Sequence, residues 1–340
     1  MRNIYQSIWV ELPYAIVQIV DVRMEAGMNC HASLQVVAIC EDEERQKFIN
    51  QPMEHEIIQA GYRECEKEPF FTGRVMEAGI AYENGQMTIK LAALSMTREW
   101  DIVKRRRTYQ NMDYTYNDVI RQVLSVYPNA LWKSEVDTDV KIPGFLLQYD
   151  ETDWEFLCRL ASHFETYIME EPAGESGQIY FGIPKIDQGH QVDSDCYQIS
   201  QNMEKYQQYT GNVTPGMMLQ NNLDWLVSDR NPYKLGETVN WKQVSCQIVS
   251  VCMEVKGAEI LYSYGLERAE GVKARYYGNQ NISGLSLPAT IKERSGNRLR
   301  VKFDIDSKYH KGNNYYFTYA IETTSWYCLP EPGSIVHIYF

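Results

Sequence analysis

Apolar and polar residues alternate along two runs that flank the dipeptide Asn84-Gly85. A period of two residues is typical of a strand with one buried face, and Asn-Gly supplies the two positive-φ positions of a type I′ turn. The pattern therefore predicts a β-hairpin with a two-residue loop. The expected cross-strand pairs are Tyr82 with Met87, Ile80 with Ile89 and Ala78 with Leu91 on one face, and Ala81 with Thr88 and Gly79 with Lys90 on the other.

A second alternating run follows the turn Ser295-Gly296-Asn297. Its apolar positions are Leu299, Val301, Phe303 and Ile305, and its polar positions are Arg298, Arg300, Lys302 and Asp304. This pattern predicts a strand with one wet face and one dry face. The runs Tyr315 to Glu322 and Gly333 to Phe340 show the same signature on either side of Pro330 and Pro332, which cannot donate to a ladder. Closely spaced strands of this kind favour a small barrel.

Helical spacing is convincing in only two places. The first predicted helix begins near Thr115 and ends before Pro128; its apolar positions are Val119, Ile120, Val123, Leu124 and Tyr127. The second begins at Thr152, which has the spacing of a capping box with Glu155. Its apolar stripe comprises Trp154, Leu157, Leu160, Ala161, Phe164 and Ile168. The stripe requires a partner surface.

The sequence shows no internal repeat and no low-complexity tract. Stretches that carry Gly and Pro favour connections between units. They lie at Glu171 to Gly177, Thr214 to Gly216 and Gly278 to Pro288.

The chain of 340 residues contains 25 Tyr and carries a formal net charge of −12. Tyrosine suits a pleated surface. The negative charge repels phosphate backbones, so nucleic acid or an anionic membrane could bind only at a local basic patch, and no nucleic acid is an expected partner. Charges interrupt every apolar run before it could span a bilayer. Because the first residues lack the pattern of a secretory signal, we expect the protein to be made in the cytoplasm.

No cofactor and no metal ion is expected. The eight cysteines contain no Cys-x-x-Cys pair, so buried, reduced thiols are the simplest interpretation. The neighbours Cys30 and His31 do not make a tetrahedral site, and His163 is interpreted as a partly buried histidine on the second helix. The acidic run from Glu41 to Glu44 is interpreted as a solvated loop face, because it lacks the spacing of a calcium loop.

Sequence motifs of enzymes with known mechanics are absent. Two clusters of charge leave alternatives open. Asp150, Glu151, Asp153 and Glu155 could act as the acid and base of a peptidoglycan-degrading enzyme, although helix capping and the helix dipole account for at least two of them. The basic run from Lys104 to Arg107, between Trp100 and Tyr109, could form a solvated or interface face. Together with Arg298 to Lys302 it could instead bind nucleic acid in an OB-type protein.

The segment of residues 148–161 resembles a motif of the hub proteins of contractile injection machines, which include the phage late-control D family and the VgrG spikes of type VI secretion. In that family the motif reads Gln-Tyr-x-Glu-(Ser/Thr)-Asp-x-x-Phe-Leu-x-Arg-Leu. The matching residues are Gln148, Tyr149, Glu151, Thr152, Asp153, Phe156, Leu157, Arg159 and Leu160, and Trp154 lies among them.

Shorter stretches are similar to the same family. Phe71 to Leu94 looks like its first barrel, and Leu235 to Val239 looks like a turn in its second. Arg298, Arg300, Val301 and Phe303, followed by Trp326 and by Pro330 to Phe340, resemble its OB-like domain. Two features depart from the family pattern: no Gly follows the second helix, and the chain stops at Phe340 where the family continues with the rest of the OB barrel.

The resemblance implies a mainly β fold with a few helices. It implies a first tube-like β-barrel at residues 1–110, a helix-bearing lateral α/β domain at 111–215, a second tube-like barrel at 216–280 and a truncated or incomplete OB-like spike-base domain at 281–340.

The resemblance also implies a structural, non-enzymatic protein. The expected partners are two further copies in a homotrimer, the hexameric inner tube protein, the spike or needle tip, baseplate wedge proteins and effectors. Such a hub is assembled into a baseplate or virion-like particle and is ejected on contraction.

Overall fold

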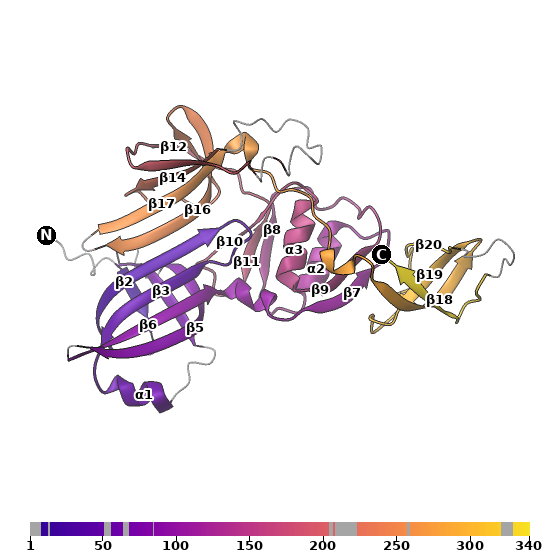
Figure 1. Cartoon of the computed structure of the whole chain (residues 1–340), viewed down its shortest axis with the longest axis horizontal. Coiled ribbons are helices and arrows are strands. Elements are labelled where there is room, and N and C mark those ends of the chain that lie inside the picture. Colours follow the sequence, from indigo (N-terminus) through magenta and orange to yellow (C-terminus); the bar gives the residue numbers. More distant parts are fainter. Residues whose placement is uncertain are drawn as a thin grey trace. The chain divides into compact units, whose positions relative to one another are not determined.

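The computed structural model describes residues 8–12, 14–50, 56–63, 68–83, 85–203, 207, 223–256, 259–320 and 329–340. As expected, the protein is mainly β with a few helices (Figure 1). In the described ranges no helix has the length and apolar character needed to cross a bilayer. By its internal contacts the chain divides into two units: unit 1 holds residues 1–99, 128–136 and 161–275, and unit 2 holds residues 100–127, 137–160 and 276–340.

The strands of unit 1 are β1 (Ile8–Glu11), β2 (Ile16–Gly27), β3 (Ser33–Cys40), β4 (Ile57–Tyr62), β5 (Pro69–Glu83), β6 (Gln86–Ser95), β8 (Leu131–Ser134), β10 (Ile168–Glu170), β11 (Gln178–Phe181), β12 (Ile186–Val192), β13 (Tyr197–Gln201), β14 (Leu223–Asp229), β15 (Glu237–Trp241), β16 (Val244–Lys256) and β17 (Glu259–Arg268). Those of unit 2 are β7 (Arg105–Tyr109), β9 (Leu146–Glu151), β18 (Ser286–Ser295), β19 (Arg298–Phe303), β20 (Phe317–Thr318) and β21 (Ile335–Tyr339). The α-helices are α1 (Glu44–Asn50), α2 (Tyr116–Leu124) and α3 (Asp153–Ser162), and short 3-10 helices lie at Met96–Asp101, Ala269–Gly271 and Gln280–Ile282.

One continuous sheet organises unit 1. Its strands follow the order β1-β4-β5-β6-β3-β2-β16-β17-β14-β13, and each neighbouring pair along this path is antiparallel. Strand β15 pairs with β16, and β12 pairs with β15. A smaller sheet has the order β10-β11-β8. Alternate side chains of the large sheet form one apolar core that draws on residues from Ile8 to Leu266.

The large sheet contains a repeat that the sequence does not reveal. Strands β2, β3, β4, β5 and β6 follow each other along the chain and stand in the sheet as β4-β5-β6-β3-β2. Strands β13, β14, β15, β16 and β17 do the same and stand as β15-β16-β17-β14-β13. The two halves of the sheet therefore have the same topology, although the sequence shows no repeat. Topology is repeated here because it needs only alternating apolar positions, and these can be filled by different residues.

Pairing of β2 with β16 joins the two repeats, and we call this pairing the in-chain seam. Met24 lies opposite Met253 on the core face of the seam, and both side chains are buried. On the other face Arg23 donates to Glu254 Oε1 over 2.7 Å and also contacts Glu25. The seam is thus continuous with the core and carries an ion pair on its exposed face.

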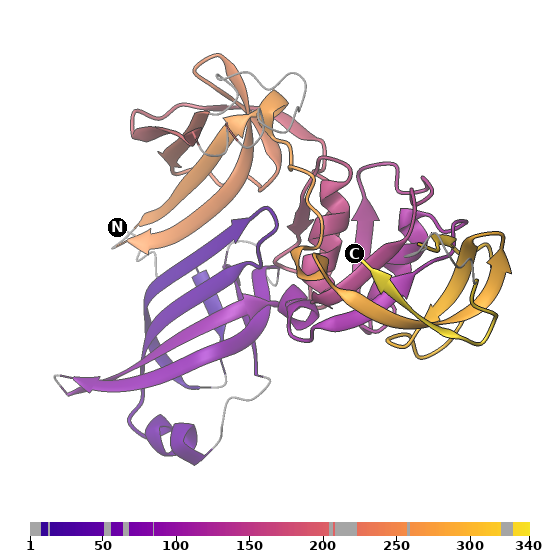
Figure 2. The same ribbon diagram turned by 45° about the vertical axis from the view of Figure 1, so that its right-hand side comes forward.

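The predicted hairpin around residue 85 is confirmed. Strands β5 and β6 pair in the expected register, with Ile80 opposite Ile89 and Tyr82 opposite Met87. Gly85 has a φ of +77°, as a type I′ turn requires, whereas Asn84 lies outside the described residues. Figure 2 shows this hairpin extending at the free end of β5 and β6.

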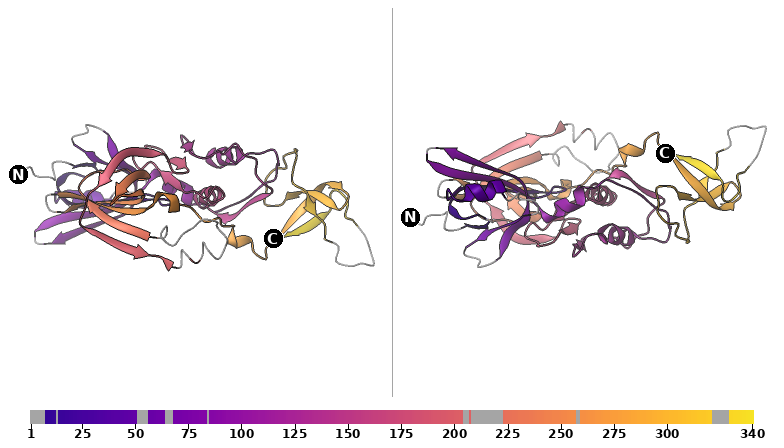
Figure 3. Two further views of the ribbon diagram at one scale, coloured as in Figure 1. Left: turned by 90° about the horizontal axis from the view of Figure 1, so that it is seen from above. Right: turned by 90° about the horizontal axis from the view of Figure 1, so that it is seen from below.

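In unit 2 the C-terminal strands form an antiparallel sheet of order β20-β19-β18-β21, seen from two sides in Figure 3. The turn at Gly296 is confirmed, and Leu299, Val301 and Phe303 are buried. The predicted strand is shorter than expected, because it ends at Phe303 and Ile305 packs on the same core from the next turn. Of the run Tyr315 to Glu322, only Phe317–Thr318 forms a strand, and its last two residues lie outside the described ranges, as does Trp326.

Both predicted helices are present, and each has a capping box. In α3 the Thr152 amide donates to Glu155 Oε2 over 2.8 Å, and the Glu155 amide donates to Thr152 Oγ1 over 3.1 Å. In α2 Thr115 and Asp118 form an equivalent box. The predicted stripe of the second helix was too long: α3 ends at Ser162, so Phe164 follows the helix and Ile168 begins β10.

A third α-helix was missed. The acidic run at 41–44 was interpreted as a loop, but Glu44 begins α1, and only Glu41, Asp42 and Glu43 precede it as exposed residues. The helix has seven residues and none of them is buried, so it lacks the apolar stripe that identifies a helix in a sequence.

The cysteines that the structure describes carry free thiols. Cys40, Cys158 and Cys246 are buried, as expected for small apolar side chains. Cys30 and Cys196 are exposed, so the prediction of buried thiols is wrong for these two. His163 is partly buried, as predicted.

Candidate functional site

The predicted motif segment spans the last four residues of β9, the single connecting residue Thr152 and nearly all of α3. Strand β9 pairs antiparallel with β7, so that Arg105 lies opposite Glu151 and Arg107 opposite Gln148. The basic run and the acidic cluster, which the sequence analysis treated as separate features, therefore meet in one network. We call the side chains of Arg105, Arg106, Arg107, Gln148, Asp150, Glu151, Asp153 and Arg159 the charged network.

Asp153 is the centre of the charged network and is fully buried. Its Oδ2 accepts hydrogen bonds from Arg105 Nε over 2.9 Å and from the Tyr127 hydroxyl over 2.7 Å. Its Oδ1 accepts from Gln148 Nε2 over 3.0 Å and from Arg107. Burial, together with the hydrogen bond to Asp153, raises the pKa of Tyr127 to about 12. A buried carboxylate with four donors is a structural anchor, because its charge and its lone pairs are satisfied.

Glu151 and Arg159 form a second buried ion pair. Arg159 donates to both carboxylate oxygens of Glu151, over 2.7 and 2.8 Å, and to the carbonyl oxygen of Leu147 over 2.8 Å. Both side chains are less than one-tenth exposed. This planar, bidentate contact ties α3 back to strand β9.

Asp150 occupies the exposed edge of the charged network. Arg106 donates to its two carboxylate oxygens over 2.7 and 3.1 Å and lies over the Tyr149 ring. The Arg106 guanidinium lowers the pKa of the Asp150 carboxyl below its ordinary value. Asp150 also has a left-handed backbone with a φ of +51°, at the point where β9 turns toward α3.

Hydrogen bonds to the backbone and apolar contacts also hold the motif segment in place. Gln148 Nε2 also donates to the carbonyl oxygens of Glu151 and Thr152, and the Thr152 hydroxyl donates to Asp101 over 2.5 Å. Phe156 stacks on Tyr109 with ring centroids 5.5 Å apart. Trp154, Leu157 and Leu160 are buried as well.

The four carboxylates proposed as an acid and base pair are therefore all engaged in structural contacts: Asp150, Glu151 and Asp153 with guanidinium groups, and Glu155 with a helix cap. Arg105, Arg106 and Arg107, which were candidates for binding phosphate, are engaged with two of these carboxylates. The described residues include no group of three or more His, Cys, Asp or Glu side chains placed to hold a metal ion.

The OB-like residues lie in β19. Val301 and Phe303 are fully buried, and Arg298 is exposed. Arg300 donates to the Asn314 carbonyl oxygen over 2.8 Å and to Glu293 over 2.9 Å. Leu147, from the strand that carries the motif, packs in the same apolar cluster as Phe303. The structure thus brings the motif segment and the OB-like strand into one core.

Two glycines of the weaker family likenesses lie where a side chain would collide. A Cβ on Gly73, in β5, would lie 2.3 Å from the carbonyl oxygen of Leu94. Gly236 has a φ of +77°, and a Cβ there would lie 2.6 Å from Met169. The neighbouring Glu237 is buried and contacts His190 Nδ1 over 2.5 Å. Gly73 therefore marks a close approach of two backbones, whereas Gly236 is favoured by its left-handed backbone conformation.

An open hollow of about 570 Å³ lies between β7 and the loop after β19. Asp306 in this loop accepts from the Thr108 amide over 3.0 Å and from the Thr108 hydroxyl over 2.5 Å. Burial raises the pKa of Asp306. The contact between Thr108 and Asp306 could not be predicted from the sequence, because the two residues are almost 200 positions apart.

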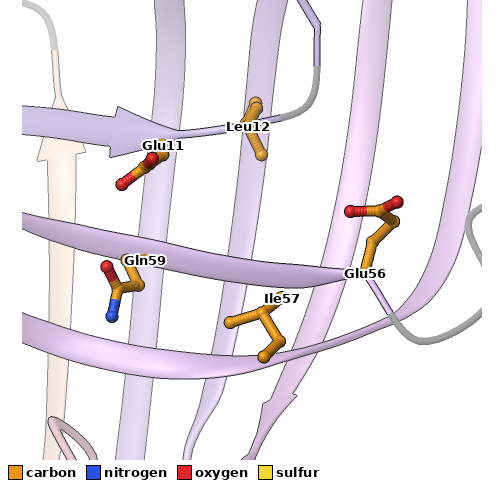
Figure 4. Close-up of a pocket in the computed structure, with 5 residues that line it drawn as sticks. All are labelled: Glu11, Leu12, Glu56, Ile57 and Gln59. Atoms are coloured by element: carbon orange, nitrogen blue, oxygen red, sulfur yellow. The ribbon is translucent and has the colours of Figure 1, made fainter. Parts of the chain in front are cut away.

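A second hollow, of about 380 Å³, lies at the β1 and β4 edge (Figure 4). Glu11 and Gln59 face each other across the two strands, and Glu56 precedes β4. Leu12 and Ile57 complete its lining. The described residues that line the hollow thus supply two carboxylates, one amide and two aliphatic side chains.

Comparison with solved structures identifies the fold. It is that of a type VI secretion system component, of a prophage tail protein and of a chain in a PdpA-VgrG complex. No family model and no curated protein sequence matches the chain.

Three solved structures illustrate the similarity. An E. coli protein, c3393, described as a component of the type VI secretion system with structural similarity to the bacteriophage T4 tail proteins gp27 and gp5, aligns with a TM-score of 0.69 and 10% identity over 98% of this chain and 96% of its own. The 43 kDa tail protein of prophage MuSo2 from Shewanella oneidensis aligns with a TM-score of 0.61 and 12% identity over 80% and 99%. A Francisella PdpA-VgrG complex aligns with a TM-score of 0.59 and 10% identity over 94% and 71%. At these identities the likeness establishes the fold alone.

Proposed function

We propose that the protein is the structural hub of a contractile injection machine, a homotrimeric adapter that joins a hexameric inner tube to the spike and the baseplate. The repeated topology of the large sheet is the observation that carries this proposal. Two equivalent halves in each chain give six in a trimer, so that one assembly can match sixfold symmetry on one side and threefold symmetry on the other.

In this proposal the two sheet halves are the two tube-like barrels. The first lies within residues 1–110, and the second comprises β13 to β17 and so begins before the expected boundary at residue 216. The helix-bearing domain, expected at 111–215, then ends before β13, and the spike-base domain occupies residues 281–340. The partners are the inner tube protein, the spike tip, baseplate wedge proteins and effectors. The hub is made in the cytoplasm, enters a particle and is ejected on contraction.

The motif residues Gln148 to Leu160 have a structural role in this function. Their buried ion pairs and capping box hold α3 on β9, which favours a rigid lateral domain over a catalytic one. The occupied carboxylates favour a non-enzymatic hub over a peptidoglycan-degrading enzyme. The occupied arginines likewise disfavour an OB-type nucleic-acid-binding protein.

Light scattering coupled to size exclusion, followed by electron microscopy of the purified protein, tests the proposal. The expected particle has three times the mass of the 39.6 kDa chain and appears as a ring with a central channel and six similar lobes. A monomer without an axis of symmetry at tens of micromolar protein would contradict the proposal.

A further inference from the structure

The in-chain seam shows how two halves of the sheet join. Strands β16 and β2 pair antiparallel there, with Met253 opposite Met24 and Glu254 opposite Arg23. On the core face Met24 is 9% exposed and Met253 is 2% exposed. The neighbouring core-face positions, Val22 and Val255, are 0% and 5% exposed.

The repeat fixes which residues of β5 correspond to those of β16. Each strand has a bulge against its hairpin partner, between Val75 and Glu77 in β5 and between Ile248 and Ser250 in β16. In each hairpin the same number of paired residues lies between the bulge and the loop, from Glu77 to Glu83 in β5 and from Ser250 to Lys256 in β16. Counting from the bulge, Ile80 corresponds to Met253, Ala81 to Glu254 and Tyr82 to Val255.

The same comparison relates β13 to β2. Val22 and Met24 in β2 pair with Val36 and Leu34 in β3, whereas Tyr197 and Ile199 in β13 pair with Val227 and Trp225 in β14. Val36 and Val227 correspond, because they pair with Leu91 and Tyr264 at equal positions of the two hairpins. Ile199 therefore corresponds to Met24, Gln198 to Arg23 and Tyr197 to Val22.

The strands that form the in-chain seam have counterparts with open edges. Beyond Arg74, β5 pairs only with β6 among the described residues, and in the same ranges β13 pairs only with β14. On these edges Tyr82 is 62% exposed, Tyr197 is 43% exposed and Ile199 is 51% exposed, and Ile80 is half-buried. Positions that are buried at the in-chain seam are thus apolar and exposed at the two open edges.

We propose that copies of this chain join through these edges, β13 of one copy pairing antiparallel with β5 of the next in the register of the in-chain seam. Ile199 then lies opposite Ile80, Gln198 opposite Ala81, and Tyr197 beside Tyr82. The second copy is the occupant because this junction continues the sheet with the geometry that the chain already uses once. The proposal rests on the proposed homotrimer and specifies which strands and residues form its interface.

Strand direction agrees with this arrangement. Neighbours alternate in direction along the path of the sheet, and β5 and β13 occupy its third and last places among ten strands. They consequently run in opposite directions. A rotation about an axis along which the strands run preserves their direction, so β13 meets β5 of the next copy antiparallel. A head-to-tail contact of this kind closes into a ring and removes the exposed strand edges.

The junction between copies differs from the in-chain seam in charge. At the in-chain seam the exposed face carries the Arg23 to Glu254 ion pair. Gln198 and Ala81 occupy these two positions between copies, so the junction has apolar contacts and backbone hydrogen bonds but no ion pair at this place. The ring should therefore persist at about 1 M salt, because screening weakens ion pairs and leaves apolar burial intact.

Opposite charges at the two isoleucines test the register. Ile80→Lys and Ile199→Glu should each shift assembly to an ~100-fold higher protein concentration, since each would bury a lone charge in the junction. The double variant places Lys opposite Glu and should recover at least ~10-fold of that loss. Ile49→Lys, at an α1 residue that is 62% exposed and away from both edges, is the matched control.

Mass by light scattering across a dilution series is the readout, and circular dichroism and thermal melting confirm that each monomer folds. Wild-type rings with unchanged assembly in both single variants would overturn the junction and leave the homotrimer standing. Two weakened single variants without recovery in the double variant would overturn the register. A monomeric wild type would overturn both the junction and the proposed function.

Discussion

At the residue scale, Glu165 shows how this chain ends a helix without the glycine of the family pattern. Glu165 has a φ of +53°, and the amides of Glu165 and Thr166 donate to the carbonyl oxygens of Ser162 and Ala161 over 3.1 and 3.3 Å. This pair of bonds is a Schellman motif, in which Gly normally takes the left-handed position. The exit of α3 is therefore a Schellman turn with a non-glycine residue in the left-handed position.

Glu165→Gly should raise the free energy of unfolding by about 0.5–1 kcal/mol, because Gly takes the left-handed conformation without a steric penalty. The lost ion pair with Lys273 is exposed and costs little. Urea denaturation measures the change. Glu165→Ala, which loses the same ion pair and keeps the strain, is the control, and a Gly variant less stable than the Ala variant would contradict this account.

Glu170 is a second residue with an unusual environment, because its carboxyl group is buried. It is buried in β10 and accepts hydrogen bonds from Ser95 over 2.6 Å, from Thr97 and from the Ala32 amide. Burial raises the pKa of Glu170 above its ordinary value despite these donors. At a pH between the unfolded and the folded pKa of Glu170, the folded protein thus holds a proton at this site that the unfolded chain has released.

Stability should therefore fall as pH rises from the unfolded pKa through the folded pKa of Glu170, because the folded state must give up its proton into a buried site. Glu170→Gln keeps an acceptor for Ala32 and does not titrate. The wild type and this variant should have similar stability near pH 4, and the wild type should lose stability relative to the variant toward pH 8. Denaturation curves at several pH values measure the difference, and a constant difference would contradict it.

At the element scale, pairing of β7 with β9 converts two runs of like charge into one neutralised network. Arg105 and Arg107 meet at the buried Asp153, whereas Arg106 meets the exposed Asp150. Buried ion pairs are costly to break, because the remaining charge stays without a partner. The two carboxylates, three residues apart, should therefore differ strongly in their contribution to stability.

Asp153→Asn should lower the free energy of unfolding by about 3–5 kcal/mol, since it leaves two guanidinium groups around a neutral amide. Asp150→Asn is the matched control. It should cost less than about 1 kcal/mol, because its ion pair with Arg106 is exposed and Asn tolerates a left-handed backbone. Equal losses in the two variants, measured by chemical denaturation, would show that the network is not organised around Asp153.

At the scale of the whole molecule, the arrangement of charge disfavours nucleic-acid binding. The net charge is −12, and the only run of four basic residues places three of them against carboxylates. Counterion release needs cations that are free to meet phosphates. The chain therefore presents an acidic surface without a free basic strip at this place.

Filter binding with single-stranded DNA and RNA should detect no binding at ~0.15 M salt and no steep dependence on salt at lower concentrations. An acidic protein of similar mass serves as the negative control. Affinity that falls steeply with added salt, and that is lost in an Arg106→Ala variant, would instead support a nucleic-acid-binding function.

Features that depend on neighbours in sequence could be predicted from sequence. The hairpin at Gly85 and the capping box at Thr152 each involve residues only a few positions apart, so alternation and spacing were sufficient. The family motif also indicated the class of fold before the structure did. Helix α1 was not predicted, because its seven residues have no buried face and therefore show no periodic pattern of apolar positions.

Sequence by itself determined the hairpin at Gly85, the strand after Gly296, helices α2 and α3 and the excess of negative charge, because these follow from local sterics and composition. Only the tertiary structure decided which charges meet and which strands repeat. The basic run and Asp153 are more than forty residues apart, and the two halves of the sheet share topology without shared residues. Long-range pairing is selected by the whole core at once, so no short stretch of the chain encodes it.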